Sequence, residues 1–244
     1  MNTKERKELI KKISLITESD SLTSTKKAID AFIYALATTV KNAMIGTGKV
    51  EVFIDDFLCV PEIYKFTRTI AIEEAIQCYT DIFHQSEPGE DILSPVYEEM
   101  YTSRISNKMN NSAQMLTPSS IAEFGSKIII KNNDDVIETG MDMCCGLGAL
   151  ALKLFKQSHK KNTITERFAL ADLDPVMCAG AYAQLALNNF HYRAVNILEV
   201  YNIDAILDYD KFCESGYGLV IANIFNENEK TNNKIQKQKE EVSL

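Results

Sequence analysis

Two acidic residues and two glycines, spaced as in nucleotide-binding proteins, are the residues of this chain best suited to chemistry. Asp142 begins the run Asp-Met-Cys-Cys-Gly-Leu-Gly, in which Gly146 and Gly148 stand where a predicted strand turns into a predicted helix. Further along, Asp172 ends a second predicted strand. A glycine-rich turn lets backbone N–H groups approach a ligand, and an acid at the next strand end accepts hydrogen bonds from ribose hydroxyls. The pattern therefore predicts a nucleoside-binding site.

The spacing within this pattern favours S-adenosylmethionine over a dinucleotide. A pyrophosphate-binding turn usually has a third glycine, whereas Ala151 takes that place here, and Asp172 falls slightly later than the usual acid. For the turn considered by itself, a tight strand-to-helix connection without ligand is an equally good interpretation. Asp174 is better explained as the N-cap of the following helix, with Pro175 at the first helical position.

The elements that must position these residues alternate between strand and helix patterns. After residue 135 the sequence predicts strands near 136–142, 167–172, 192–196 and 217–223, with helices near 148–158 and 175–189. Earlier segments have apolar residues at helical spacing, and they predict helices near 4–16, 26–44, 63–84, 95–108 and 121–130, with one short strand near 50–54. We therefore predict an α/β fold, namely a partial doubly wound, Rossmann-like domain preceded by a helical N-terminal region. The predicted divisions are 1–112 for the helical region, 113–225 for the α/β domain and 226–244 for a polar tail.

Composition narrows the class of protein. The 244 residues carry a net charge of −8 and are 45% apolar, which suits a globular protein and gives no broad basic surface for nucleic acid. If the protein acts on DNA, we expect another component to supply the contacts that hold the DNA. The six cysteines show no metal-ligand spacing, and we recognise no signal peptide or apolar run of membrane-spanning length. We expect a cytoplasmic protein with reduced thiols and no membrane partner, in which Cys144 and Cys145 are small packing residues.

Three segments in a fixed order resemble the N6-adenine DNA methyltransferases that serve as modification subunits of type I restriction-modification systems. Segment 113–118, Ala-Gln-Met-Leu-Thr-Pro, is similar to that family's G-Q-F-F-T-P. Segment 142–148 is similar to its D-P-x-C-G-S-G, and segment 172–175 to its E-x-D-P or D-x-D-P. The resemblance covers about residues 95–225. It implies a methyltransferase domain that binds S-adenosylmethionine.

The same resemblance assigns roles to further residues. It implies that Gln114, Thr117 and Pro118 help to enclose the methionine end of the cofactor. Asn196, at the end of the third predicted strand, is a candidate contact for the adenine ring, although a turn-forming asparagine explains it equally well. With Asp142, Gly146, Gly148 and Asp172, these residues form the predicted cofactor site.

The chain departs from the family at the catalytic motif. The family has N-P-P-F or N-P-P-Y, in which the asparagine holds the adenine amino group and the aromatic ring stacks on the extruded base. Here the segment reads Asn223-Ile224-Phe225-Asn226, so Asn223 and Phe225 are the candidate catalytic residues. Because a Pro-Pro pair fixes φ, its absence predicts a less preorganised loop.

A second departure concerns the strands that follow the catalytic motif in the family. Three further strands are expected there, and each crossover takes about 30 residues. Residues 226–244 are too few and too polar for this. We therefore expect strand 217–223 to lie at an open sheet edge, covered by a partner chain, a second copy or the N-terminal helices.

Two functions from different classes follow. The first is an S-adenosylmethionine-dependent DNA adenine-N6 methyltransferase, or a subunit of one that reaches DNA through a partner or specificity subunit in a homo- or hetero-oligomer. The second is a catalytically inactive binding protein on a reduced methyltransferase scaffold, acting on a restriction-modification or other DNA-processing complex. A truncated remnant of marginal stability is a third interpretation. The loop at 223–226 is the feature that separates the first two.

Overall fold

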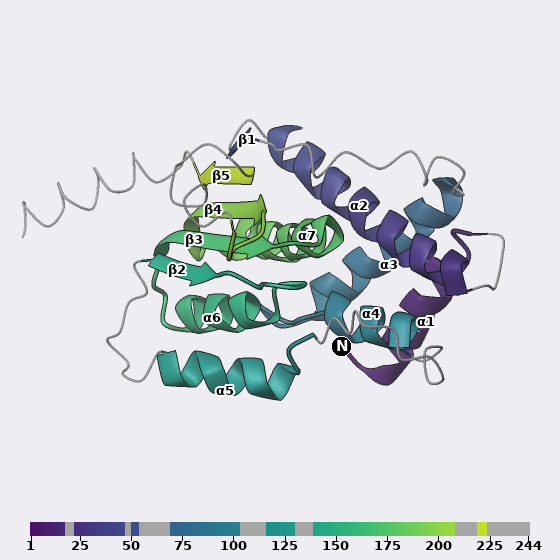
Figure 1. Ribbon diagram of the computed structural model, residues 1–244, viewed down its shortest axis with the longest axis horizontal. Helices are drawn as coiled ribbons and strands as arrows, with labels where there is room; N and C mark the ends of the chain where they lie inside the picture. Colours follow the sequence, from purple (N-terminus) through teal and green to yellow (C-terminus); the bar gives the residue numbers. More distant parts are fainter. Residues whose placement is uncertain are drawn as a thin grey trace, which may run out of the picture.

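The computed structural model describes residues 1–17, 22–46, 50–53, 69–102, 116–129, 139–207 and 219–223 (Figure 1). The first half of the chain is mainly helical, as predicted, and comprises α1 (Thr3–Ser14), α2 (Leu22–Gly46), β1 (Val50–Phe53), α3 (Thr69–Gln85), α4 (Leu93–Thr102) and α5 (Ser119–Ile129). The second half alternates strands and helices: β2 (Thr139–Asp142), α6 (Ala149–Lys160), β3 (Thr165–Asp172), α7 (Pro175–Tyr192), β4 (Val195–Asn202) and β5 (Leu219–Asn223).

The strands form one mixed sheet in the order β1-β5-β4-β3-β2. β2, β3 and β4 are parallel, with Asp142 opposite Leu170 and Asp172 opposite Asn202, so their carboxyl ends lie at one edge of the sheet. Three parallel strands alternating with helices confirm the predicted partial Rossmann-like fold. β5 is antiparallel to both β4 and β1. Figure 1 shows its arrow pointing opposite to that of β2.

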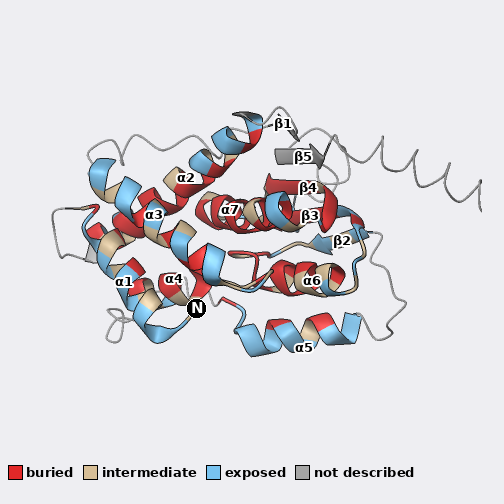
Figure 2. Ribbon diagram, turned by 180° about the vertical axis from the view of Figure 1, so that it is seen from behind, coloured by how far each residue is buried: buried red, intermediate tan, exposed pale blue. Residues whose placement is uncertain are grey.

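The central helix α7 lies between the sheet on one side and α2 on the other (Figures 1 and 2). Its sequence explains this position, because the helix is apolar around its whole circumference and rich in alanine, so it can be buried on two sides. Phe168 and Leu170 of β3 and Leu198 and Val200 of β4 point into the same core as α7. Helix α6 packs beside α7, and α5 packs on α6.

The N-terminal helices share this core with the α/β part. Buried side chains of α1, α2, α3 and α4 belong to the same apolar cluster as those of α6, α7, β3 and β4. Helix α2 is long and apolar enough by composition to span a membrane, contrary to our expectation of no such run, with its candidate span at Thr23–Ile45. In its most apolar window, however, 61% of the residues are buried inside the molecule. Contacts with α7, α4, α3 and α1 account for its apolar character.

Two sequence predictions are wrong in detail. The third strand of the α/β part, expected near 192–196, is β4 at Val195–Asn202, because α7 continues to Tyr192. The fourth strand does not lie at an open edge, because β5 is paired on one side with β4 and on the other with β1. Because β5 is antiparallel to β4, no parallel crossover is needed between them. The predicted boundary at 112–113, the tail 226–244 and the end of the helix expected at 95–108 lie outside the described residues.

Candidate functional site at the carboxyl ends of the parallel strands

The turn between β2 and α6 depends on two left-handed glycines. Gly146 has φ +52° and Gly148 has φ +89°, a region that other residues rarely adopt. The Cys145 N–H donates to the Ala171 carbonyl at 2.9 Å, and the Gly148 N–H donates to the Cys145 carbonyl at 2.8 Å. The turn is therefore folded tightly and fastened to the end of β3.

The carboxylate of Asp172 connects this turn to the next one. Its Oδ2 accepts a hydrogen bond from the Gly146 N–H at 2.9 Å, and its Oδ1 accepts one from the Asp174 N–H at 2.9 Å. A carboxylate has about four acceptor positions, so about two remain for a ligand hydroxyl. Asp172 thus lies at the glycine turn, as the spacing predicted, and keeps part of its accepting capacity.

A second carboxylate lies beside it at the end of β2. Burial raises the pKa of Asp142, and the negative charge of Asp172 raises it further, while the Cys144 N–H, which donates to Asp142 Oδ1 at 3.4 Å, acts in the opposite direction. Two carboxyl groups at adjacent strand ends give this edge of the sheet a negative electrostatic potential. Such an edge suits a ligand that offers hydroxyl or ammonium donors.

The segment that precedes α5 lies across the glycine turn. Leu116 is buried, and a Cβ placed on Gly146 would lie 3.2 Å from Leu116 Cδ2. Thr117 and Pro118 are exposed, and the Pro118 carbonyl accepts hydrogen bonds from the Ile121 and Ala122 N–H groups at 2.9 and 3.0 Å, which starts α5. Two of the three segments that carry the family resemblance therefore meet in space. Gln114 lies outside the described residues.

The asparagine at the carboxyl end of β4 is Asn202 and not Asn196. Asn202 is opposite Asp172, and its Nδ2 donates to the carbonyls of Asp172 and Leu173 at 3.1 and 2.9 Å. Asn196 begins β4, is buried, and its Nδ2 donates to Glu166 Oε2 at 2.6 Å. Six residues at ~3.3 Å each separate the two asparagines, or about 20 Å along the strand. The apolar residues Ile197, Leu198 and Val200 beyond Asn196 were the sequence signal for the later strand end.

The structure does not bring Asn223 to this edge. Its neighbour Ala222 pairs with Ile197, at the amino end of β4, and Asn223 itself pairs with Val50 of β1. The antiparallel direction of β5 therefore places the Asn223 backbone at the opposite end of the sheet from Asp142 and Asp172. Phe225, the second candidate catalytic residue, lies outside the described residues.

Two cysteines near the turn, Cys145 and Cys178, are not activated nucleophiles. Burial raises the pKa of the Cys145 thiol well above its ordinary value, and burial likewise raises the pKa of the Cys178 thiol. Cys178 donates to the carbonyls of Asp172 and Tyr201, both at 3.3 Å, so it has a structural role. Cys145 is packed as predicted, whereas Cys144 is exposed. Among the described residues, no group of three or more His, Cys, Asp or Glu side chains is arranged to hold a metal ion.

Gln184 of α7 supports the turn from behind and was not anticipated from the sequence. Its Nε2 donates to the Leu147 carbonyl at 2.8 Å and to Asp91 Oδ1 at 3.1 Å. Its Oε1 accepts from the N–H groups of Ile92 and Leu93 at 2.9 and 3.1 Å. A polar residue within the apolar pattern of α7 was the available signal, because buried amides are retained where they satisfy backbone groups.

Comparison with known proteins gives one match. The family model described as N-6 DNA Methylase matches residues 88–242, which includes the glycine turn, Asp172 and the segment across the turn. No curated protein matches the chain. No solved structure matches it either.

Proposed function

The chain belongs to the N-6 DNA methylase family, and from this premise we propose that it is an S-adenosylmethionine-binding, DNA adenine-N6 methyltransferase-like protein that needs a partner for transfer to DNA. The observation that carries the proposal is the Asp172 carboxylate at the carboxyl end of β3, joined to the Gly146 N–H at 2.9 Å with acceptor positions to spare. Ligands of parallel α/β sheets bind at this edge.

The residues at the strand ends fit the chemical groups of the cofactor. Asp172 would accept hydrogen bonds from the ribose hydroxyls, and Asn202 replaces Asn196 as the candidate for the adenine end. Helix α6 begins after Gly148 without a side-chain cap, so its first-turn N–H groups are suited to the cofactor's carboxylate. Thr117 and Pro118 would border the methionine end. Asp142 would attract the cofactor's ammonium group.

The chemistry that S-adenosylmethionine supplies when bound is a methyl group made electrophilic by the adjacent sulfonium. The chain's own residues would hold the cofactor, and they would exclude water where Leu116 covers Gly146. No strong base is required once a target amine is aligned and partly desolvated. Asn223 and Phe225 are the residues proposed to hold an extruded adenine, on the basis of the family resemblance alone. We also propose that the protein acts in the cytoplasm. Because its net charge is −8, we propose that it contacts DNA through a partner or specificity subunit.

A second candidate function is supported by the direction of β5. Because Asn223 follows Ala222, the partner of Ile197, its backbone lies about 20 Å from the Asp172 edge at ~3.3 Å per residue. In this arrangement the chain would bind S-adenosylmethionine without transferring its methyl group, and it would act as a binding protein within a DNA-processing complex.

Two measurements on the purified chain test the proposal and separate the two candidates. Calorimetry with S-adenosylmethionine tests binding, which both candidates require, so a complete absence of binding would reject both. Transfer of labelled methyl groups to DNA of mixed sequence tests catalysis. Transfer that disappears in Asn223→Ala, with cofactor affinity retained, would establish a self-sufficient enzyme. Binding without transfer would favour a partner-dependent subunit or the binding protein. Transfer restored by a DNA-processing partner would then select the subunit.

A further inference from the structure

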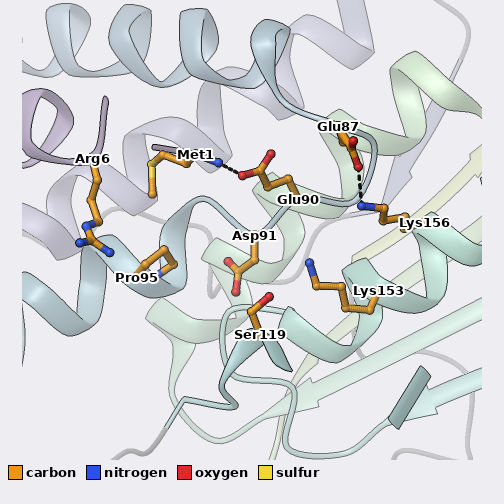
Figure 3. Close-up of a pocket in the computed structure, with 9 residues that line it drawn as sticks. All are labelled: Met1, Arg6, Glu87, Glu90, Asp91, Pro95, Ser119, Lys153 and Lys156. Carbon is orange, nitrogen blue, oxygen red and sulfur yellow. Dashed lines mark hydrogen bonds and ion pairs between the residues drawn. The ribbon is translucent and has the colours of Figure 1, made fainter. Parts of the chain in front are cut away.

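A cavity of about 400 Å³ lies between the N-terminal helices and the α5–α6 pair (Figure 3). Its lining residues come from α1, from the connection between α3 and α4, from α4, from the amino end of α5 and from α6. They are Met1, Arg6, Glu87, Glu90, Asp91, Pro95, Ser119, Lys153 and Lys156. None of them belongs to the glycine turn or to β3.

Most charges at this cavity are already compensated. The Met1 ammonium pairs with Glu90, and Lys156 Nζ lies 2.6 Å from Glu87 Oε2 (Figure 3). Arg6 Nε lies 2.8 Å from Glu99 Oε2, outside the cavity lining.

The Asp91 carboxylate is also occupied by hydrogen bonds. Its Oδ1 accepts from the Ser94 N–H and from Gln184 Nε2, both at 3.1 Å. Burial raises the pKa of Asp91, while its hydrogen bonds with Ser94 and Gln184 and the charge of Lys153 act in the opposite direction.

Lys153 is the exception. The residue is only 8% exposed, and no hydrogen bond or ion pair joins it to any part of the chain that the structure describes. Figure 3 shows its side chain directed into the cavity, toward the side where Asp91 and Ser119 lie. Burial lowers the pKa of the ammonium and the nearby charge of Lys156 lowers it further, while the charges of Asp91, Glu123 and Glu87 act in the opposite direction. An ammonium on a largely buried side chain, with no described carboxylate within salt-bridge distance, favours an anion in the cavity that it faces.

The amino end of α5 lies at the same cavity. The helix has 11 residues and begins at Ser119, whose hydroxyl and backbone N–H are at its positive end. Helix amino ends favour negative charge because their first N–H groups have no partner within the helix. The Lys153 ammonium and a helix amino end thus lie at one cavity, and both favour the same kind of ligand.

We propose that this cavity binds a small molecule bearing a single oxyanion group, a carboxylate or a phosphate, held by the Lys153 ammonium and the amino end of α5. The lining carboxylates disfavour a polyanion such as a nucleic acid backbone. A volume of about 400 Å³ is within the range of small-molecule sites. Because the lining residues come from both halves of the chain, the ligand would fasten the N-terminal helices to α5 and α6. The site is independent of the proposed cofactor function.

Thermal unfolding and calorimetry of the full chain, with acetate and with inorganic phosphate, test this proposal against sodium chloride at equal ionic strength. We expect saturable stabilisation by at least one of the two anions and none by chloride. A response to acetate alone identifies a carboxylate ligand, and a response to phosphate alone identifies a phosphate ligand. If neither anion stabilises the wild-type chain beyond chloride, the proposal is wrong.

Lys153→Met retains the shape of the side chain and removes its charge. We expect anion binding to weaken at least about tenfold, because a charge-assisted contact is lost. We also expect the anion-free variant to be at least as stable as wild type, because a partly desolvated charge with no carboxylate in direct contact is removed. Lys153→Arg should retain measurable binding. The matched control is Lys160→Met at the exposed end of the same helix, which does not line the cavity, and its affinity should stay within about threefold of wild type.

Three outcomes would overturn the assignment. The first is unchanged anion affinity in Lys153→Met. The second is a marked loss of stability in anion-free Lys153→Met, which would mean that Asp91 already serves as the partner. The third is mutual exclusion between the anion and S-adenosylmethionine, which would make the cavity part of the cofactor site. If S-adenosylmethionine does not bind at all, the anion experiments still stand, because they do not depend on it.

Discussion

At the scale of single residues, Asp172 has two roles that must be separated experimentally. Its carboxylate connects the β2–α6 and β3–α7 turns through the N–H groups of Gly146 and Asp174. It is also the residue proposed to accept the ribose hydroxyls. A substitution therefore affects both the local fold and the ligand, and the two effects need different measurements.

Asp172→Ala should weaken S-adenosylmethionine binding roughly ten- to hundredfold, since a charge-assisted contact is worth about 1.5–3 kcal/mol. Calorimetry measures the affinity, and urea unfolding measures the accompanying loss of stability. Asp174→Ala is the control two residues away. Asp174 accepts from the Val176 N–H at 2.9 Å as the N-cap of α7, so its loss should cost about 1 kcal/mol of stability with little effect on affinity. Equal cofactor affinity in wild type and Asp172→Ala would show that the pocket assignment is wrong.

At the scale of elements, the buried side-chain amide of Gln184 joins α7 to two other parts of the molecule. These are the α3–α4 connection and the glycine turn. Gln184 makes four hydrogen bonds, two as donor and two as acceptor. The groups that it satisfies include three backbone groups and the Asp91 carboxylate. Its removal would therefore leave polar groups buried on several elements at once.

Gln184→Met preserves the length of the side chain and removes all four hydrogen bonds. We expect a loss of about 3–5 kcal/mol in the free energy of unfolding, because buried groups left unsatisfied cost about 1–3 kcal/mol each. Urea denaturation measures it. Gln77→Met on α3, where the amide bonds only Asp81 at the surface, should change stability by less than about 0.5 kcal/mol. A similarly small change in Gln184→Met would mean that water replaces the amide.

The carboxyl ends of α3 and α7 meet at a pair of histidines. The His191 ring lies 5.2 Å from the Phe83 ring and 5.4 Å from the His84 ring, measured between centroids. Burial lowers the pKa of His191 from its ordinary value of 6.5, and the charge of His84 lowers it further. The folded protein therefore favours the neutral imidazole.

Stability should consequently fall at acidic pH. The unfolded chain takes up a proton at His191 near pH 6.5, whereas the folded chain does so only at lower pH, so the unfolded state binds more protons in between. The stability that comes from keeping His191 neutral is complete above about pH 6.5. It is lost as the pH falls through the lower pKa that His191 has in the folded state. Urea unfolding at a series of pH values from 7.5 to about 5 should show this decline. The decline should be smaller in His191→Gln, and an identical pH profile in that variant would exclude His191 as the cause.

At the scale of the whole molecule, the helical half and the α/β half share one apolar core. Ile33 of α2 is fully buried, and its Cγ2 lies 3.5 Å from the position that a Cβ on Gly180 of α7 would occupy. β1, from the first half of the chain, pairs with β5, from the second. We therefore expect the two halves to unfold together.

Ile33→Asp should destabilise the protein by about 4 kcal/mol or more, because it buries an unpaired charge at the α2–α7 contact. Circular dichroism and limited proteolysis should show both halves lost in a single transition. Ile45→Asp, on the same helix at a side chain that is 49% exposed, is the control and should have little effect. If a protease-resistant fragment containing residues 139–207 survives in Ile33→Asp, the α/β half is an independent domain.

Self-association or binding of a partner remains a prediction, but we now expect it at the β2 edge of the sheet and not at β5. The edges of the described sheet are β1 and β2, because the strand order is β1-β5-β4-β3-β2. β2 is the edge of the parallel part, whereas β5 is paired on both sides. Exposed apolar side chains also lie on the nearby α5, namely Ile121, Phe124, Ile128 and Ile129. Light scattering of the purified chain measures its oligomeric state.

The sequence by itself determined the local features of this protein. Positive φ at Gly146 and Gly148, the N-cap at Asp174 and the acid at the end of β3 are properties of a few adjacent residues, and local chemistry specifies them. The helical first half and the alternating second half follow from apolar periodicity in the same way. The order of the three motifs also identified the family, which the family model confirms.

Only the tertiary structure decided what depends on pairing between distant segments. β5 has the same apolar pattern whether it runs parallel or antiparallel to β4, so its direction, and with it the place of Asn223, could not be read from residues 219–223. The end of β4 was misplaced because α7 continues to Tyr192, so the asparagine at the carboxyl end of β4 is Asn202 and not Asn196. Gln184 and Lys153 gain their roles from neighbours more than 30 residues away in sequence, and no local pattern records such contacts.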